Sequence, residues 1–91
     1  MSYAVEWSRR AGRDMRALRA YISVDSPGAA VRLATELGIL ADSLAEMPNR
    51  GRRDVSDPTV RELVFGRYVL RYRVVGETVL IVRVKHTAQR R

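Results

Sequence analysis

The chain has 91 residues, no cysteine, a single histidine and a formal net charge of +7. This length fits one domain, residues 1–91, with a modest hydrophobic core. The composition excludes disulfides, thiolate metal sites and histidine-rich metal sites, so we expect no metal and no cofactor. No apolar run approaches the roughly 20 residues of a membrane span, and no signal-peptide pattern is present, which predicts a cytoplasmic protein with no membrane partner.

The positive charge lies in the second half of the chain. Residues 1–48 hold six arginines and six acidic residues, whereas residues 49–91 hold eleven Arg or Lys and four acidic residues, so 11 − 4 = +7. Arginine suits two-pronged contacts to phosphate or carboxylate. The asymmetry therefore indicates an anionic partner, either nucleic acid or an acidic protein surface.

Residues 3–7 alternate apolar and polar side chains, which predicts a short opening strand. Ser8 is suited to cap a first helix that runs to about Val24. One face of that helix is apolar and carries Ala11, Met15, Leu18 and Ile22.

Ser26 and Pro27 predict the start of a second helix, because Ser caps helices well and Pro at the first helical position loses no hydrogen bond. The helix should run to about Met47, since Pro48 cannot continue it. Its apolar stripe comprises Ala30, Leu33, Leu37, Leu40 and Leu44, with Ala34 and Ala41 beside it. Two helices with a short connection predict an antiparallel helical hairpin.

Residues 49–58 are polar and predict a loop, in which Asp54 and Asp57 are typical turn formers. Residues 60–65 predict a strand, and Gly66 turns the chain. Two further strands, residues 67–75 and 78–85, are joined only by Gly76 and Glu77, which predicts a hairpin with Gly at the positive-φ position of a type II′ turn. Residues 87–91 are too few to form an element.

The order β-α-α-β-β-β predicts an α+β fold with a small antiparallel sheet and the helical hairpin packed on one face. In the simplest register of the hairpin, Arg71 faces Val82, Val69 faces Val84 and Arg67 faces His86. One face then carries Arg67, Val69, Arg71, Arg73, Val82, Val84 and His86. The opposite, more apolar face should pack against the helices, and it carries Tyr68, Leu70, Tyr72, Val74, Val79 and Ile81, with Arg83 and Lys85 at one end. A bulge would exchange these faces.

His86 is the one side chain whose ordinary titration lies near neutrality. In phosphodiester cleavage it could serve as a general acid or base, while arginines stabilise charge on the phosphate. The alternative is a strand-end histidine that is solvated or binds a partner's carboxylate. No nucleophile–base pair, glycine-rich phosphate loop or metal motif is present.

Several segments, taken in order, resemble the RelE/ParE superfamily of bacterial type II toxins. They are YISVDSPGAA, LAEMPNRGR, VRELVFGRYVLRYRV and VLIVRVKHTAQRR. The resemblance covers nearly the whole chain and implies a small antiparallel sheet with an N-terminal helical hairpin. It also implies a cognate antitoxin whose C-terminal segment wraps the toxin, and hence a hetero-oligomer.

Two activities divide this superfamily. RelE-type toxins cleave mRNA on the ribosome and usually carry an arginine directly after the first tyrosine of the hairpin strand. In this chain Val69 follows Tyr68, and no tyrosine follows Tyr72. The pattern VREL…RY…YRV…H is more similar to ParE-type toxins, which block DNA gyrase without catalysis of their own.

The resemblance therefore favours a gyrase inhibitor with no catalytic residue. The alternative is a metal-free, ribosome-dependent mRNA endoribonuclease that uses Arg61, Arg67 and His86. A third hypothesis is a nucleic-acid-binding module without toxicity. The candidate partner-binding residues are Arg61, Arg67, Arg71, Arg73, Arg83, Lys85 and His86.

Overall fold

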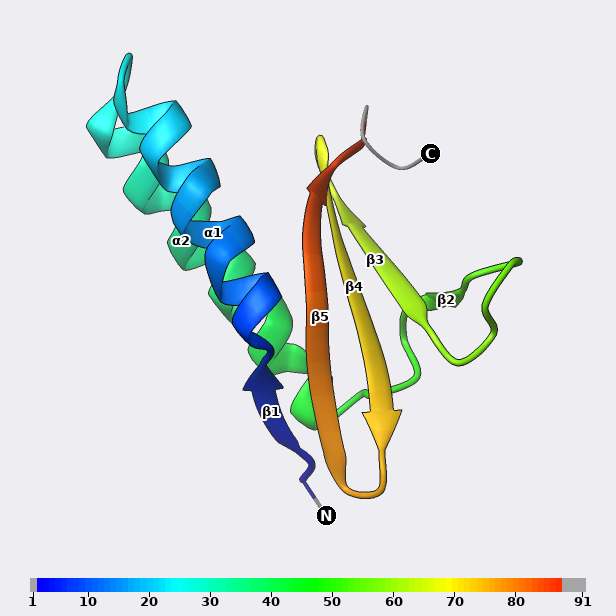
Figure 1. The fold of residues 1–91 in the computed structure, drawn as a ribbon. Helices are drawn as coiled ribbons and strands as arrows, with labels where there is room; N and C mark the ends of the chain where they lie inside the picture. Colours follow the sequence, from blue (N-terminus) through cyan, green and yellow to red (C-terminus); the bar gives the residue numbers. More distant parts are fainter. Residues whose placement is uncertain (1, 88–91) are drawn as a thin grey trace.

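A computed structural model describes residues 2–87 of the chain. Its elements are β1 (Ala4–Trp7), α1 (Arg9–Ser23), α2 (Pro27–Asp42), the 3-10 turn η1 (Ser43–Ala45), β2 (Arg52–Arg53), β3 (Arg61–Phe65), β4 (Tyr68–Val75) and β5 (Thr78–His86). The two helices lie side by side on one side of the sheet, and the loop between β2 and β3 lies away from them (Figure 1). The expected α+β fold is thus confirmed. Residues 88–91 of the expected tail lie outside the described residues.

Both helices begin where their capping residues predict. The Ser8 hydroxyl accepts a hydrogen bond from the Ala11 N–H at 3.0 Å, and the Ser26 hydroxyl accepts one from the Ala29 N–H at 3.3 Å. These bonds satisfy backbone donors that have no partner within the first helical turn. The second helix ends earlier than expected, at Asp42, and η1 completes the turn toward the sheet.

The sheet has five strands in the order β1-β5-β4-β3-β2. The pairs β2–β3, β3–β4 and β4–β5 are antiparallel, as expected, whereas β1 pairs with β5 in parallel, which makes the sheet mixed. The strand β2 was not expected, because its two residues lie in an arginine-rich stretch without alternation. No helix within residues 2–87 is long and apolar enough to cross a membrane.

Two glycine turns join the last three strands. Gly76 has a φ of 59° and is followed by a residue with negative φ, which agrees with the predicted type II′ turn. Gly66 also has a φ of 59°, and with Arg67 it forms the two-residue connection between β3 and β4. Arg67 therefore lies in this turn and not, as predicted, in the hairpin strand.

A register shift between Arg71 and Tyr72 alters the hairpin pairing from Arg71 back to Tyr68. Val75 pairs with Thr78 and Arg73 with Leu80, as predicted, but Arg71 pairs with Arg83, Val69 with Lys85 and Tyr68 with His86. The predicted pairings Arg71–Val82, Val69–Val84 and Arg67–His86 are therefore wrong. The cause is one extra residue in β5, which exchanges the faces of all residues after it.

The shift moves four side chains to the opposite face from the predicted one. Arg83 and Lys85 share the face of Arg71, because cross-strand partners point to the same side. Val84 lies in the core on the helix side, and His86 contacts Tyr68 on that side. The face that points away from the helices is thus richer in cations than predicted.

The core lies between the helices and the sheet. Its fully buried members are Ala11, Leu37, Ala41, Leu44, Leu70, Tyr72, Val79 and Ile81, with Val84 nearly so. Met15, Leu18, Leu33 and Leu40 from the predicted helical stripes pack against this cluster. The apolar periodicity of both helices thus identified the side that faces the sheet.

Candidate functional site

A groove of about 740 Å³ runs between α1 and the open end of the β4–β5 hairpin, where β4 begins and β5 ends. We call it the helix–sheet groove; its lining is Arg10, Asp14, Ala17, Leu18, Tyr21, Arg67, Tyr68, Arg83, Val84, Lys85 and His86. Leucine, valine and tyrosine side chains supply apolar surface, and five of the lining residues are Arg, Lys or His. This mixture suits a partner segment with apolar and acidic residues.

Asp14 joins α1 to the edge of β5 at one wall of the groove. One carboxylate oxygen accepts hydrogen bonds from Arg83 Nε and from the Val84 N–H, both at 2.9 Å. Burial acts to raise the pKa of Asp14, but the bonds from Arg83 and Val84 outweigh it, so the pKa lies below 3.8. Asp14 is therefore ionised at neutral pH. It binds the edge of β5 at Arg83 and Val84, beyond the residues of β5 that pair with β1.

His86 lies at the end of this groove beside Tyr68. The two rings meet edge to face with centroids 5.5 Å apart. The Thr87 N–H donates a 2.7 Å hydrogen bond to the Arg67 carbonyl, which fixes the β3–β4 turn next to the end of β5. The structure thus brings His86 and Arg67 together, on the helix side of the sheet.

A second group of cations lies on the face of the sheet away from the helices. We call it the basic face; it comprises Arg71, Arg73, Arg83 and Lys85, which line one shallow depression. Arg71 forms ion pairs with Asp54, at 2.8 Å, and with Glu62. Burial acts to lower the pKa of Arg71, but its carboxylate partners raise it overall.

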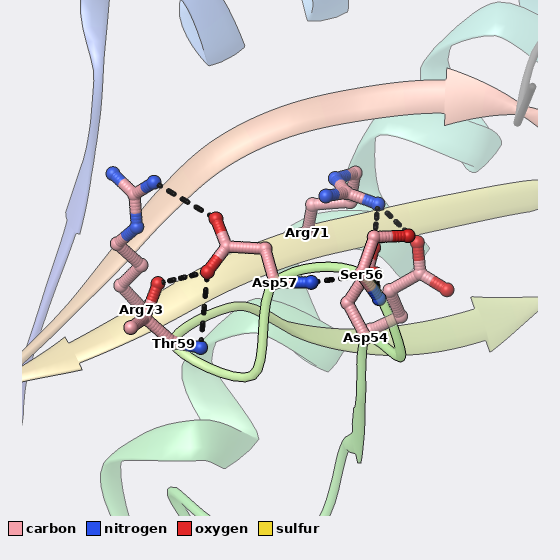
Figure 2. Close-up of polar contacts among 7 residues, drawn as sticks. Asp54, Ser56, Asp57, Thr59, Arg71 and Arg73 are labelled. Atoms are coloured by element: carbon pink, nitrogen blue, oxygen red, sulfur yellow. Dashed lines mark hydrogen bonds and ion pairs between the residues drawn. The ribbon is translucent and has the colours of Figure 1, made fainter.

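The loop between β2 and β3 supplies acidic partners to this face. Asp57 forms an ion pair with Arg73 at 3.6 Å, and Figure 2 shows Asp54 and Asp57 directed at Arg71 and Arg73. The hydrogen bond from Arg71 lowers the pKa of Asp54 below 3.8, and the hydroxyl of Thr59 is the main cause of the lowered pKa of Asp57. Both aspartates also form turns, as predicted: Asp54 accepts from the Ser56 and Asp57 N–H groups and Asp57 from the Thr59 N–H.

Arg61 lies at the opposite end of β3 from the β3–β4 turn. Its guanidinium donates to the backbone carbonyls of Asn49, at 3.2 Å, and Gly51, at 2.8 Å. Phe65, at the other end of β3, is four positions beyond Arg61, about 13 Å along the strand. Arg61 is therefore remote from Arg67 and His86, and it supports the segment that enters β2.

The same segment is anchored by Tyr72, which is fully buried. Its hydroxyl donates to the Pro48 carbonyl and accepts from the Gly51 N–H, both at 2.8 Å. Burial raises the pKa of Tyr72. A Cβ atom at Gly51 would lie 2.6 Å from the Tyr72 hydroxyl, so only glycine fits there without displacement.

The predicted candidate residues therefore occupy three places. Arg71, Arg73, Arg83 and Lys85 share the basic face, Arg67 and His86 share the helix–sheet groove with Arg83 and Lys85, and Arg61 stands apart. Sequence reasoning missed Asp14, and it treated Asp54 and Asp57 as turn formers only. No group of three metal-ligating side chains occurs within residues 2–87.

Comparison with known proteins identifies the family. Residues 5–91 match the family model described as the ParE toxin of the type II toxin-antitoxin system parDE. Toxin RelE2 of Caulobacter vibrioides is 49% identical over 86 residues, which cover 93% of this chain and 96% of that protein. Toxin RelE1 of the same bacterium is 40% identical over the full length of both chains.

Two solved structures share the fold. A chain of the chromosomal ParDE system from P. aeruginosa has a TM-score of 0.80 at 24% identity and covers 93% of this chain and 96% of its own. A chain of the toxin-antitoxin complex RelBE2 from Mycobacterium tuberculosis has a TM-score of 0.73 at 27% identity, with 94% and 92% covered. The chain belongs to the ParE toxin family of type II toxin–antitoxin systems, within the RelE/ParE superfamily.

Proposed function

We propose that this toxin acts as a ParE-like inhibitor of DNA gyrase, without catalysis of its own. The observation that carries the proposal is the ParE family match over residues 5–91. Val69 directly after Tyr68 is in keeping with it, since an aliphatic residue there resembles the ParE branch. A toxin with this target works in the cytoplasm.

The positions of the candidate ribonuclease residues also support a non-catalytic mechanism. His86 and Arg67 lie at one end of the sheet, whereas Arg61 lies at the other end and is bound to two backbone carbonyls. A general acid–base group and the cation that stabilises the phosphate must reach the same phosphodiester. The three residues do not form one such site.

A ribosome-dependent mRNA endoribonuclease is the second candidate function. Its support is that similar proteins from Caulobacter vibrioides carry the name RelE. Within this chain the candidate active-site pair is His86 with Arg67, because both line the helix–sheet groove. His86 would transfer the proton and Arg67 would stabilise the charge on the phosphate.

We further propose a cognate antitoxin as the partner that neutralises the toxin in a hetero-oligomer. Solved structures with the same fold come from the ParDE toxin–antitoxin system of P. aeruginosa and from the toxin–antitoxin complex RelBE2 of Mycobacterium tuberculosis. The helix–sheet groove offers apolar surface and cations to an antitoxin segment with apolar and acidic side chains. Of the predicted contact residues Arg61, Arg67, Arg71, Arg73, Arg83, Lys85 and His86, four line this groove: Arg67, Arg83, Lys85 and His86.

The decisive experiment assays the purified toxin in two reactions side by side: DNA supercoiling by gyrase and cell-free translation. We expect supercoiling to stop with gyrase-linked DNA breaks, while translation continues. Addition of the proposed cognate antitoxin should restore supercoiling. Arrest of translation, with mRNA cut inside ribosome-bound codons and gyrase unaffected, would refute the gyrase proposal and establish the ribonuclease.

A further inference from the structure

Acidic side chains of the same chain lie against the cations of the basic face. Four cations line its depression, and the acidic side chains Asp54 and Asp57 line the same depression from the β2–β3 loop. Figure 2 shows both aspartates in front of β4, with their carboxylates turned toward Arg71 and Arg73. The loop therefore occupies positions on these arginines that an external anion would otherwise take.

The two ion pairs differ in strength. The side chains of Arg71 and Asp54 are only 21% and 16% exposed, and Glu62 holds the same guanidinium from β3. Arg73 and Asp57 are 46% and 45% exposed and lie 3.6 Å apart, as expected of a weak surface pair. The contact at Arg73 is thus the one that opens most readily.

The acidic loop keeps its shape independently of these arginines. Asp54 uses Oδ1 for the Ser56 and Asp57 N–H groups, and only its Oδ2 for Arg71. Asp57 divides its oxygens in the same way between Thr59 and Arg73. Backbone bonds from the Asp54 N–H to the Val60 carbonyl and from the Val60 N–H to the Asp57 carbonyl close the loop at its base. Loss of the arginine contacts therefore releases a formed turn and does not unfold it.

We propose that residues 54–59 are a displaceable acidic lid, which neutralises the basic face until the phosphates of a nucleic-acid strand replace its carboxylates on Arg71 and Arg73. The basic face then binds single-stranded nucleic acid, with an affinity that falls as the salt concentration rises. This inference stands apart from the choice between gyrase and ribosome, because its readout is strand binding by the purified chain.

Charge favours a nucleic acid as the occupant. With the lid closed, the positive charge of the four cations of the basic face is balanced by four carboxylates, Asp14, Asp54, Asp57 and Glu62. Removal of the two lid carboxylates leaves an excess of two positive charges on a face whose arginines suit phosphate geometry. The half of the chain from residue 49 onward also carries the entire net charge of +7, which attracts a polyanion.

The test measures fluorescence anisotropy of a labelled 12-nucleotide single-stranded DNA with three proteins. The lid variant carries Asp54→Asn and Asp57→Asn, because Asn keeps the turn-forming acceptor oxygen and loses the charge. The control carries Glu36→Gln and Asp42→Asn, two exposed residues of α2 that remove the same charge away from the basic face. Circular dichroism verifies that both variants are folded.

We expect the lid variant to bind about tenfold more tightly than the control at low salt. The slope of log affinity against log salt should steepen by about 1.4, as two further phosphates are neutralised. Adding Arg71→Gln and Arg73→Gln to the lid variant should abolish the gain. Equal affinity of the lid variant and the control, or a gain that survives loss of both arginines, would overturn the proposal.

The wild-type chain supplies a second, independent readout. Titration with the same oligonucleotide should shift the backbone amide resonances of Ser56, Asp57 and Thr59, since displacement of the lid changes their surroundings. Unchanged resonances at saturation would overturn the lid. Movement of these resonances with a poly-glutamate peptide but not with the oligonucleotide would overturn nucleic acid as the occupant.

Discussion

Replacement of Tyr72 by Phe removes one hydroxyl from a fully buried side chain. That hydroxyl donates to the Pro48 carbonyl and accepts from the Gly51 N–H, so the variant leaves the buried donor of Gly51 and the partly buried acceptor of Pro48 without their partner. An orphaned buried polar group costs about 1–3 kcal/mol. We expect a loss of about 2 kcal/mol of unfolding free energy, or roughly 10 °C in Tm for a domain of this size.

Urea denaturation followed by circular dichroism measures the loss, with Tyr21→Phe as the matched control. Tyr21 is 79% exposed, so removal of its hydroxyl should change the unfolding free energy by less than about 0.5 kcal/mol. In Tyr72→Phe the Gly51 amide should also exchange its hydrogen faster, because it has lost its acceptor. A stability equal to that of the control, with unchanged exchange at Gly51, would refute the role of Tyr72 as an anchor.

Three further outcomes follow from the contacts described. Asp14→Ala should lower the unfolding free energy by about 1–3 kcal/mol, since it leaves Arg83 without its carboxylate partner; an unchanged urea midpoint would contradict this. The pKa values of Asp54 and Asp57 are lowered in the folded state, so their stabilising effect is present above 3.8 and is lost as the pH falls through the folded pKa values. The difference in urea midpoint between wild type and the Asp54→Asn, Asp57→Asn variant should therefore be present at pH 6 and vanish in strong acid; a constant difference would argue against it. Gly38→Ala should raise the unfolding free energy by about 0.5–1 kcal/mol, because Gly38 is helical and a Cβ there meets nothing within 4 Å; thermal melts that show no rise would exclude it.

Local rules were sufficient for the helix starts and for the glycines at the turns of this fold. Ser8, Ser26 and Pro27 set the helix starts, and Gly66 and Gly76 set the turns, because each acts through its own backbone or its nearest neighbours in the chain. The apolar stripes likewise identified the buried side of both helices. These features need no knowledge of distant contacts.

The faces of the hairpin could not be obtained in this way. The extra residue in β5 is Val82, between Ile81 and Arg83, where no glycine or other local signal marks a bulge. Helix α1 stabilises the altered edge: Ser8 donates to the Val82 carbonyl, and Asp14 accepts from the Val84 N–H. The first contact joins residues that are 74 positions apart in the sequence, and the second joins residues that are 70 positions apart. Sequence spacing alone does not reveal them.

The acidic lid illustrates the same limit. Asp54 and Asp57 were correctly predicted to form turns, but their second oxygens meet arginines that lie 17 and 16 positions further along the chain. Whether a turn projects over a sheet or into solvent depends on how the chain returns to β3. The sequence therefore showed a concentration of cations but not their internal partners.

The pairing of β1 with β5 has a consequence for synthesis in the cell. β5 is the last described strand to leave the ribosome, yet it lies inside the sheet, between β1 and β4. Until it emerges, β1 has no strand to pair with, and the core between the helices and the sheet lacks Val79, Ile81 and Val84. The parallel β1–β5 pair and the complete core therefore form only after β5 has left the ribosome.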